Sequence, residues 1–446
     1  MFRSWQAITL WKRVLVGMVI GLGAGLALRY GLPDITTGDE PMTGAQRAAN
    51  IGDIWIKPWG DAFVRLIKML IIPLIATTLV AGVTAMGDPK KLGTLGARTI
   101  GLYLLTTLFA VSLGLAMGTF IEPGTGVEYS TASDADLEQV RMKMKSAKES
   151  GGFVERLIAI IPSNPVAALA DGAVLPTIFF SIMIGVGILL TGKPADPVKH
   201  FFDAAAEVVL KITLMVMELA PYGVCALMAW VMATKGIEVL SNLLWLAVAL
   251  YATCILQIVV VYGGIIITGI LRLPARQFFR GIADAQGVAF STASSSATLP
   301  VSISCAEKNL GVDKSVAGSV LPLGATINMD GTAIYLGLVA LFAAQAGGFE
   351  LTLTQYFLVA MTATLVSIGA AGIPSAGLLL AATVLEVIGI SPEQSLLVIA
   401  FIFPFDRLLD MMRTVTNVSG DIAVACTVAQ WENELDETVF RTEAEV

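Results

Sequence analysis

Long apolar segments recur along this chain of 446 residues and limit the folds that are open to it. Windows of about 20 apolar residues occur throughout, and as helices they are long enough to cross a bilayer core of about 30 Å. Hydrophobic residues make up 56% of the chain and charged residues 14%, whereas soluble domains carry roughly 25% charged residues. We therefore expect a helical integral membrane protein, because a helix satisfies its own backbone hydrogen bonds in lipid.

Six apolar segments fill the first half of the chain. They lie near residues 8–30, 55–85, 97–121, 157–192, 198–231 and 237–271. A polar stretch at about residues 130–156 interrupts them, and we interpret it as a solvated loop. Basic residues gather in short loops such as "DPKKLGTLGAR", which the positive-inside rule assigns to the cytoplasm. The four cysteines have no paired spacing and are interpreted as packed thiols, not as disulfides or metal ligands.

From residue 276 onward, two apolar segments break at a small, polar tip. The segment "GVAFSTASSSATLPVSI" breaks around Ser291 to Pro300, and "ATLVSIGAAGIPSAGLLLAATV" breaks around Ser367 to Pro374. Each half is too short to span a bilayer, and each segment precedes a longer helix that carries polar residues. Small residues alone would be explained by close helix packing. Two matching breaks instead favour an inverted repeat, in which broken helices meet at a substrate site near the membrane midplane.

The last long helix contains "FDRLLDMMRTVTNVSGD", residues 405–421, with three aspartates and two arginines in an apolar setting. At about 100° per residue, six polar residues of this stretch share one arc of about 100°. They are Asp406, Asp410, Arg413, Thr414, Asn417 and Asp421. Arg407 lies at the margin of the arc, so we expect its side chain to extend to the membrane interface. Each charge at a bilayer centre costs roughly 2.5–3.5 kcal/mol, so the arc must face protein, water or ligand.

The negative charge of this arc exceeds what its one arginine neutralises, so we expect cations to bind. The segment "GATINMDGT" adds the carboxylate of Asp330, and its Asn, Asp and Gly are poor formers of helix interior. An unwound turn there would release main-chain carbonyls, which are oxygen ligands suited to Na⁺. Arg413 would fit a substrate carboxylate and Asp410 an amine. With an α-carboxylate at serine-rich backbone amides, these groups describe an acidic amino acid.

The motifs "SSSATLP", "NMDGT", "GAAGIPSAG" and "DMMRTVTNVSGD" resemble, in order and spacing, those of the glutamate transporter family. These proteins are sodium-coupled symporters of amino acids and dicarboxylates. The resemblance implies an all-α integral membrane protein with eight transmembrane helices and two re-entrant helical hairpins, arranged as inverted repeats in an elevator-type transporter. It further implies a homotrimer in the cell membrane, the inner membrane in a Gram-negative bacterium, with both termini cytoplasmic. An enzymatic activity and a nucleic-acid partner are not expected.

The resemblance also divides the chain. The first scaffold helices would occupy residues 1–96, the third and fourth helices 97–196, the fifth and sixth helices 197–271, and the core transport region 272–446. Within the core region we expect hairpin one at 276–306, the seventh helix at 313–344, hairpin two at 352–388 and the eighth helix at 392–430. Hairpin two would gate the extracellular side, and hairpin one the cytoplasmic side.

The resemblance assigns site residues as well. Arg413 would bind the side-chain carboxylate with Asp406 behind it, and Asp410 would take the amine. The remaining substrate groups would be held by Thr414, Asn417, Thr332, Ser294, Ser295, Ser296, Ile373 and Gly377. Sodium would bind at Gly324, Asn328, Asn417 and Asp421; at Thr326, Met329, Ser367, Ile368 and Ala370; and at Tyr103, Thr106, Thr107, Asn328 and Asp330. We expect two to three sodium ions per substrate. Without the resemblance, the third set would be interpreted partly as ordinary helix packing.

The predicted function is sodium-coupled uptake of aspartate, glutamate or both. A dicarboxylate symporter of the same family would also use Arg413, but its substrate has no amine for Asp410. A substrate-gated anion channel is a further alternative, which concentrative uptake would separate from a carrier. An intramembrane serine hydrolase is disfavoured, because the only histidine, His200, lies in a basic loop. Proton and potassium coupling are disfavoured, because Leu336 stands where mammalian glutamate carriers have a glutamate after "NMDGT".

Overall fold

The computed structural model describes most of the chain, in eight stretches. They are residues 10–35, 42–84, 96–126, 158, 160–236, 239–348, 350–370 and 376–442. Within them the chain is helical and forms no β-strand beyond two isolated bridges, so the predicted all-α class is confirmed for these residues. The polar stretch predicted at 130–156 as a solvated loop lies outside the described residues.

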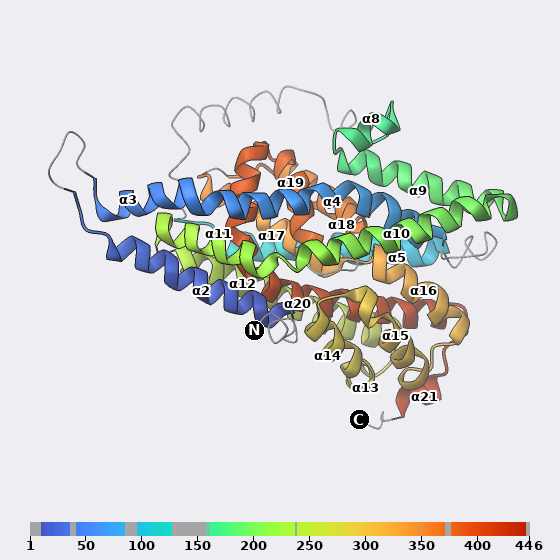
Figure 1. The fold of residues 1–446 in the computed structure, drawn as a ribbon. Coiled ribbons are helices and arrows are strands. Elements are labelled where there is room, and N and C mark those ends of the chain that lie inside the picture. The colour runs from blue at the N-terminus through green and yellow to red at the C-terminus, as the bar shows by residue number, and fades with distance from the viewer. Residues whose placement is uncertain are drawn as a thin grey trace, which may run out of the picture.

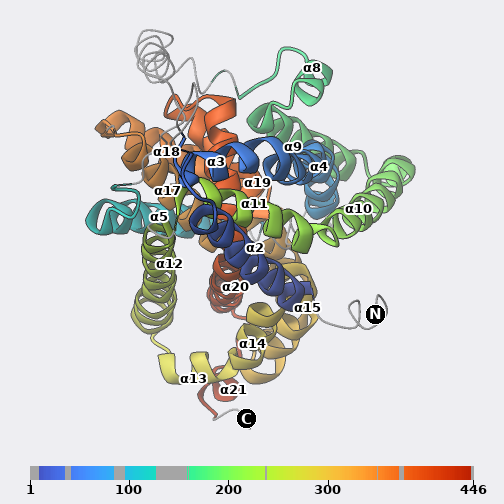
Figure 2. The same cartoon turned by 60° about the vertical axis from the view of Figure 1, so that its left-hand side comes forward.

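The first half of the chain forms a group of long helices and several short ones. They are α2 (Leu10–Gly31), α3 (Gly44–Ile51), η1 (Gly52–Ile56), α4 (Lys57–Thr84), α5 (Ala97–Ile121), α8 (Pro165–Ala170), α9 (Val174–Thr191), η3 (Lys193–Ala195), α10 (Asp196–Met217), α11 (Ala220–Lys235), α12 (Val239–Leu256) and η4 (Gln257–Ile270). Helix α11 packs against α2 and α4, and the three run side by side in both views (Figures 1 and 2). The α12 helix continues directly into the π-helix η4.

Two of the predicted apolar spans differ from the structure. The segment predicted at 157–192 contains the short helix α8 and the separate helix α9, because Pro165 begins α8 and Gly172, with φ of 74°, follows it. The segment predicted at 198–231 is divided between α10 and α11, which meet at an angle of 48°. Pro221 explains this break, since proline fits the first turn of α11 but cannot continue α10.

The second half forms two helix pairs, each followed by a long segment. The elements are α13 (Ala275–Gly281), α14 (Ala283–Thr292), α15 (Ser295–Ser304), η5 (Cys305–Asn309), α16 (Lys314–Ile327), α17 (Asp330–Ala346), α18 (Leu353–Ile368), α19 (Ala376–Val387), α20 (Pro392–Trp431) and α21 (Glu437–Arg441). The α14–α15 pair turns at Ala293, whose φ of 50° is left-handed, and α13 to α15 lie with α21 at the lower side of both views (Figures 1 and 2). The tip between α18 and α19 includes residues 371–375, outside the described ranges.

The two long segments of the second half differ in continuity. The backbone leaves the helical region at Asn328 (φ −88°, ψ 85°) and Met329 (φ −113°, ψ 53°), so the predicted unwound turn between α16 and α17 is confirmed. Helix α20 is continuous over 40 residues, from Pro392 to Trp431. Its Thr414 and Ser419 hydroxyls donate to carbonyls four residues earlier, which satisfies them inside the helix.

Helix α17 forms the centre of the molecule. Every residue from Asp330 to Ala344 is buried, and the contacting helices are α5, α12, α18, α19 and α20. In the described part of the chain, four helices are long and apolar enough to cross a membrane, or five if α10 and α11 form one bent span. The four are Lys12–Gly31, Ala97–Ile121, Ser241–Ile270 and Lys314–Ala346. These helices support a multi-pass membrane protein, and the predicted number of eight spans stays a prediction.

Candidate binding site for an anion and cations

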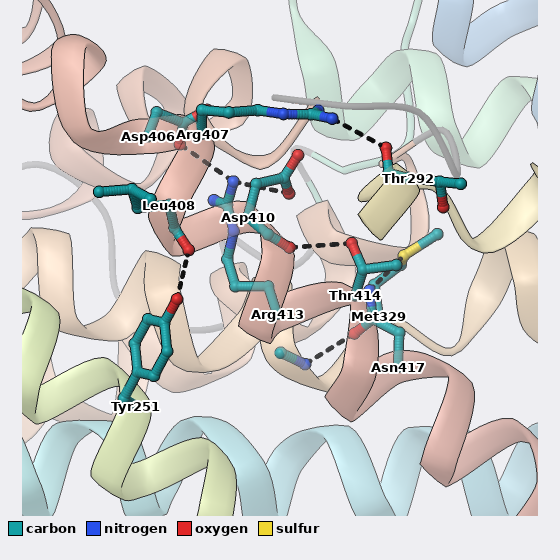
Figure 3. A network of polar contacts seen from close by, with 11 residues as sticks. Tyr251, Thr292, Met329, Asp406, Arg407, Leu408, Asp410, Arg413, Thr414 and Asn417 are labelled. Carbon is teal, nitrogen blue, oxygen red and sulfur yellow. Dashed lines mark hydrogen bonds and ion pairs between the residues drawn. The ribbon is translucent and has the colours of Figure 1, made fainter. Parts of the chain in front are cut away.

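The side chain of Arg413 lies at the centre of α20 and is fully buried. Its Nη2 donates hydrogen bonds to Oδ1 of Asp406 at 3.0 Å and to Oδ1 of Asp410 at 2.8 Å (Figure 3). Its guanidinium carbon lies 4.0 Å from the ring centre of Tyr335, in cation–π contact. Its Nε and Nη1 are buried and have no hydrogen-bond partner among the described residues. Because a guanidinium is only a donor, these N–H groups require an acceptor and are suited to an anion.

The start of α19 covers the open side of this guanidinium. A Cβ atom placed on Gly377 would lie 2.9 Å from Arg413 Nη1 and 2.9 Å from Cγ2 of Thr332. A side chain at this position would make the Arg413 guanidinium or the Thr332 methyl group shift, so glycine permits the closest approach. The structure thus brings together Arg413, Asp410, Thr332 and Gly377 of the predicted substrate set. The predicted contributor Ile373 lies outside the described residues.

The tip of hairpin one contains the three predicted serines. Ser294 is the N-cap of α15, and its hydroxyl accepts from the backbone N–H of Ala297 at 3.1 Å. Ser294 and Ser295 are buried, whereas Ser296 is exposed. Helix α15 contacts α20, which places the tip beside the helix that carries Arg413.

The structure contradicts the expectation that the Arg407 side chain extends to the membrane interface. The side chain is only 9% exposed and does not extend to an interface. Its Nη2 donates to the carbonyl oxygen of Thr292 at 3.1 Å, at the end of α14 (Figure 3). The prediction was wrong because the helical wheel gives the direction of a side chain but not the acceptor that another segment supplies.

Asn417 joins α20 to the unwound turn between α16 and α17. Its Oδ1 accepts from the backbone N–H of Gly331 at 2.8 Å, and its Nδ2 donates to the sulfur of Met329 at 3.2 Å. The buried Thr414 hydroxyl donates to the carbonyl of Asp410 at 2.9 Å. Figure 3 shows Thr414 and Asn417 beside Met329, at the unwound turn.

Asp421 is the centre of the first predicted sodium set. Nδ2 of Asn328 donates to its Oδ1 at 2.9 Å. A Cβ on Gly324 would lie 2.5 Å from this same oxygen and 2.5 Å from the Tyr103 hydroxyl. The structure therefore brings Gly324, Asn328 and Asp421 into contact, and it adds the hydroxyl of Tyr103 to their surroundings.

Asp330 lies in the third predicted set and is fully buried. Thr107 donates to its Oδ1 at 2.6 Å and Thr106 at 3.5 Å. Two donors on η4 were missed: the Tyr262 hydroxyl, 2.5 Å from Oδ2, and Gln257 Nε2, at 3.5 Å. The only signal was two polar side chains inside the predicted span 237–271, five residues apart, which suits the wider turn of a π-helix.

The Tyr103 hydroxyl makes a different contact from the one that the third set implied. It donates to the carbonyl of Val320 at 3.0 Å, on α16. Tyr103 therefore lies against Gly324 and Asp421, where the first predicted set is centred. The two predicted sets are neighbours through this residue and through Asn328, which also lies 3.4 Å from the Thr106 hydroxyl.

The second predicted set is less closely connected. Helices α16 and α18 contact each other, but within the described ranges no hydrogen bond joins Thr326 or Met329 to Ser367, Ile368 or Ala370. The Ser367 hydroxyl donates to Thr364, and its carbonyl accepts from the backbone N–H of Ala370 at 2.9 Å. This end of α18 adjoins the tip that includes residues 371–375, outside the described ranges.

Neither Asp330 nor Asp421 forms an ion pair with a lysine or arginine in the described part of the chain. The described residues also contain no cluster of three or more His, Cys, Asp or Glu of the kind that holds a transition metal. All four cysteines are free thiols; Cys254, Cys305 and Cys426 are buried, and Cys225 is half-buried. Two buried carboxylates that have only neutral hydrogen-bond donors are suited to small hard cations with oxygen ligands.

The sequence profile of the sodium:dicarboxylate symporter family matches residues 10–431. A proton/sodium-glutamate symport protein of Geobacillus stearothermophilus is 33% identical over 425 residues, 95% of each chain. A proton/glutamate-aspartate symporter of Escherichia coli (strain K12) is 34% identical over 385 residues, 85% of this chain and 86% of the relative. A C4-dicarboxylate transport protein of Brucella anthropi is 33% identical over 431 residues, 96% of this chain and 91% of the relative.

Proposed function

Because the chain belongs to the sodium:dicarboxylate symporter family, we propose that it takes up acidic amino acids, aspartate or glutamate, together with sodium ions. It is a transporter, not an enzyme. One observation carries the proposal: among the described residues, the buried Arg413 has donors without acceptors, and in a second region Asp330 and Asp421 have no basic partner. A bound anion would accept hydrogen bonds from Arg413, and bound cations would balance the charges of Asp330 and Asp421.

In this proposal the substrate binds between α17, α19, α20 and the tip of hairpin one. Arg413 receives the side-chain carboxylate, with Asp406 holding the guanidinium from behind. Asp410 takes the amine, since an ammonium beside a buried carboxylate is stabilised by its charge. The other contacts are proposed to come from Thr414, Asn417, Thr332, Ser294, Ser295, Ser296, Ile373 and Gly377.

Charge supports a requirement for several cations. The buried core contains the carboxylates of Asp330, Asp406, Asp410 and Asp421 and the guanidinium groups of Arg407 and Arg413, a net charge of −2. An acidic amino acid contributes a further −1, so three monovalent cations would neutralise the loaded core, and two would leave −1. We propose two to three sodium ions, at the sets around Asp421, around Asp330, and at the end of α18.

The family also gives the proposed architecture. We infer eight transmembrane helices and two re-entrant hairpins, in a homotrimer of the cell membrane with both termini in the cytoplasm. The scaffold would be formed by residues 1–96, 97–196 and 197–271, and residues 272–446 would move as the transport region of an elevator. Hairpin two, residues 352–388, would open toward the outside, and hairpin one, residues 276–306, toward the cytoplasm.

A C4-dicarboxylate is the second candidate substrate, and one contact favours it. Oδ1 of Asp410 accepts a hydrogen bond from Arg413, so this carboxylate already has a cationic partner and does not depend on a substrate amine. The Brucella anthropi relative carries C4-dicarboxylate transport in its name. Against this candidate, a dicarboxylate would bring a second negative charge close to Asp410 without an ammonium to offset it.

Binding to the purified protein across a sodium titration tests the proposal. We expect aspartate or glutamate to bind more tightly than succinate, and the affinity to rise with sodium concentration at a slope of two to three on logarithmic axes. Equal binding in choline and in sodium buffer would overturn sodium coupling. Tighter binding of succinate than of either amino acid would replace the first substrate class by the second. Concentrative uptake into sealed vesicles distinguishes a carrier from an anion channel.

A further inference from the structure

Arg407 is a second guanidinium inside the core and has donors left over. A guanidinium carries five N–H bonds. One nitrogen of Arg407, Nη2, donates to the carbonyl of Thr292, whereas Nε and Nη1 are buried without a hydrogen-bond partner among the described residues. The whole residue is only 9% exposed. Donors of a buried cation are costly to leave unpaired, so they indicate an acceptor beyond those that the described residues supply.

The Thr292 contact places this guanidinium at the tip of hairpin one. Two residues later, Ser294 caps α15, a ten-residue helix whose N-terminal end carries partial positive charge. Arg407 and Arg413 are six positions apart on α20, so their backbones are separated by about 9 Å along the helix axis. Asp410 lies between the two arginines in Figure 3. Two guanidinium groups with unpartnered donors therefore lie at two places along one helix.

We propose that Arg407 binds the second carboxylate of the substrate, the one that Arg413 does not hold, and so makes the site specific for diacids. In an acidic amino acid this group is the α-carboxylate. The inference depends on the proposed function, because it adds a residue to the same substrate site. It also gives the Thr292 hydrogen bond a role. This bond orients the Arg407 guanidinium, and its Nε and Nη1 donate to the substrate carboxylate.

A purely structural role for Arg407 makes a different prediction. If it only fastened hairpin one to α20, its removal would weaken the binding of every substrate by the same factor. A residue that contacts a carboxylate instead discriminates between a carboxylate and its amide. The ratio of the two affinities therefore reports contact, whatever happens to the stability of the hairpin.

The experiment uses full-length wild type, Arg407→Gln and Arg407→Lys, with aspartate and aspartate α-amide as probes in saturating sodium. Calorimetry should give an aspartate affinity about 30–100-fold weaker for Arg407→Gln, with a change under threefold for the α-amide. Arg407→Lys keeps the charge but loses the planar fork, so we expect an intermediate ratio. Equal losses for both probes, or no loss for aspartate, would overturn the inference.

Arg13 offers a matched control. It is 5% exposed and pairs with Glu218, in a different helix pair, so Arg13→Gln removes a buried arginine of the same kind. We expect its aspartate-to-amide ratio to equal that of wild type. If Arg407→Gln does not fold, the ratio measured with Arg407→Lys decides, and a wild-type ratio there counts against the inference.

A failure of the proposed function can be told apart from a failure of this inference, because in that case wild type itself binds no aspartate in sodium. If wild type binds succinate but not aspartate, succinate and its half-amide succinamate replace the probes with the same expected ratios.

Discussion

The two halves of the buried polar region differ in how their charges are balanced. Residues 406–413 contain two carboxylates and two guanidinium groups, and Arg413 pairs with both carboxylates. Among the described residues, Nε and Nη1 of both arginines have no acceptor, whereas one acceptor, Oδ2 of Asp406, has no donor. Around Asp330 and Asp421, hydroxyl and amide groups supply the hydrogen bonds and no basic side chain pairs with either carboxylate in the described ranges. The first half is suited to an anion and the second to cations, although both are built on α17 and α20.

The two halves are joined by a small number of contacts. Asn417 holds the backbone of Gly331 and the sulfur of Met329, directly beside Asn328, which holds Asp421. A helix broken at Asn328 and Met329 therefore meets a continuous helix at the point where the halves adjoin. This geometry supports coupling, because a cation that orders the unwound turn also orders the backbone next to Arg413.

The largest expected effect is on aspartate binding, through Arg413→Cys. This substitution removes the central cation of the anion half, the region around residues 406–413. Removing one partner of a buried ion pair costs about 3–5 kcal/mol, so we expect the aspartate affinity to fall by about 150- to 5,000-fold. Binding of a neutral amino acid such as serine should become detectable, because the fixed cation is gone. Competition binding with both ligands measures this. Arg13→Cys, a buried arginine outside the site, is the control, and unchanged aspartate affinity in Arg413→Cys would contradict the assignment.

The cation half is tested by Asp421→Asn, which removes a charge but keeps the shape. We expect the slope of logarithmic aspartate affinity against logarithmic sodium concentration to fall by about one. The sodium affinity should weaken by at least about 10–100-fold, since the loss of a group that only supports a metal ligand already costs that much. The exposed Asp436→Asn, at the N-cap of α21, is the control. An unaltered slope would show that sodium binds elsewhere.

Some residues of the site could be predicted from the sequence and others could not. The arc of residues 406–421 could be predicted because a helical period places its polar residues on one face, and the unwound turn because Asn, Asp and Gly disfavour helix interiors. Tyr262 and Gln257 could not, since their approach to Asp330 depends on how η4 packs against α17. Arg407 was misplaced for the same reason, because its acceptor belongs to another segment.

In the fold, too, features set by local composition could be predicted, whereas features set by packing could not. Helices around single breaks, such as α16 and α17, follow from local composition. The division between α10 and α11 at Pro221 was missed, because an apolar run of that length conceals a proline that begins a new helix. The charged stretch of α20 was expected to lie on one long helix, but the segments that bury its charges could not be predicted from the order of residues alone.

Two glycines allow the comparison to be tested with one kind of substitution. A Cβ on Gly377 would meet Arg413, whereas a Cβ on Gly324 would meet Asp421 and Tyr103. Overpacking of this kind costs about 1–3 kcal/mol. We expect Gly377→Ala to weaken aspartate affinity at saturating sodium by about tenfold, and Gly324→Ala to weaken sodium affinity by about tenfold. Each variant is the control for the other, and equal effects of both on both ligands would mean that the halves do not act separately.

The smallest expected effect comes from Tyr262→Phe, which removes one hydroxyl donor from Asp330. A single hydrogen bond to a charged group is worth about 1.5–3 kcal/mol, but water and the remaining donors Thr107 and Gln257 would offset most of it. We therefore expect sodium affinity to change by about fivefold or less, with no change in the ratio of aspartate to glutamate affinity. Tyr251→Phe is the control, because that hydroxyl donates to the carbonyl of Leu408, in the anion half. A larger loss of sodium binding in Tyr251→Phe than in Tyr262→Phe would break the division, since it would tie the cations to the half that contains the arginines.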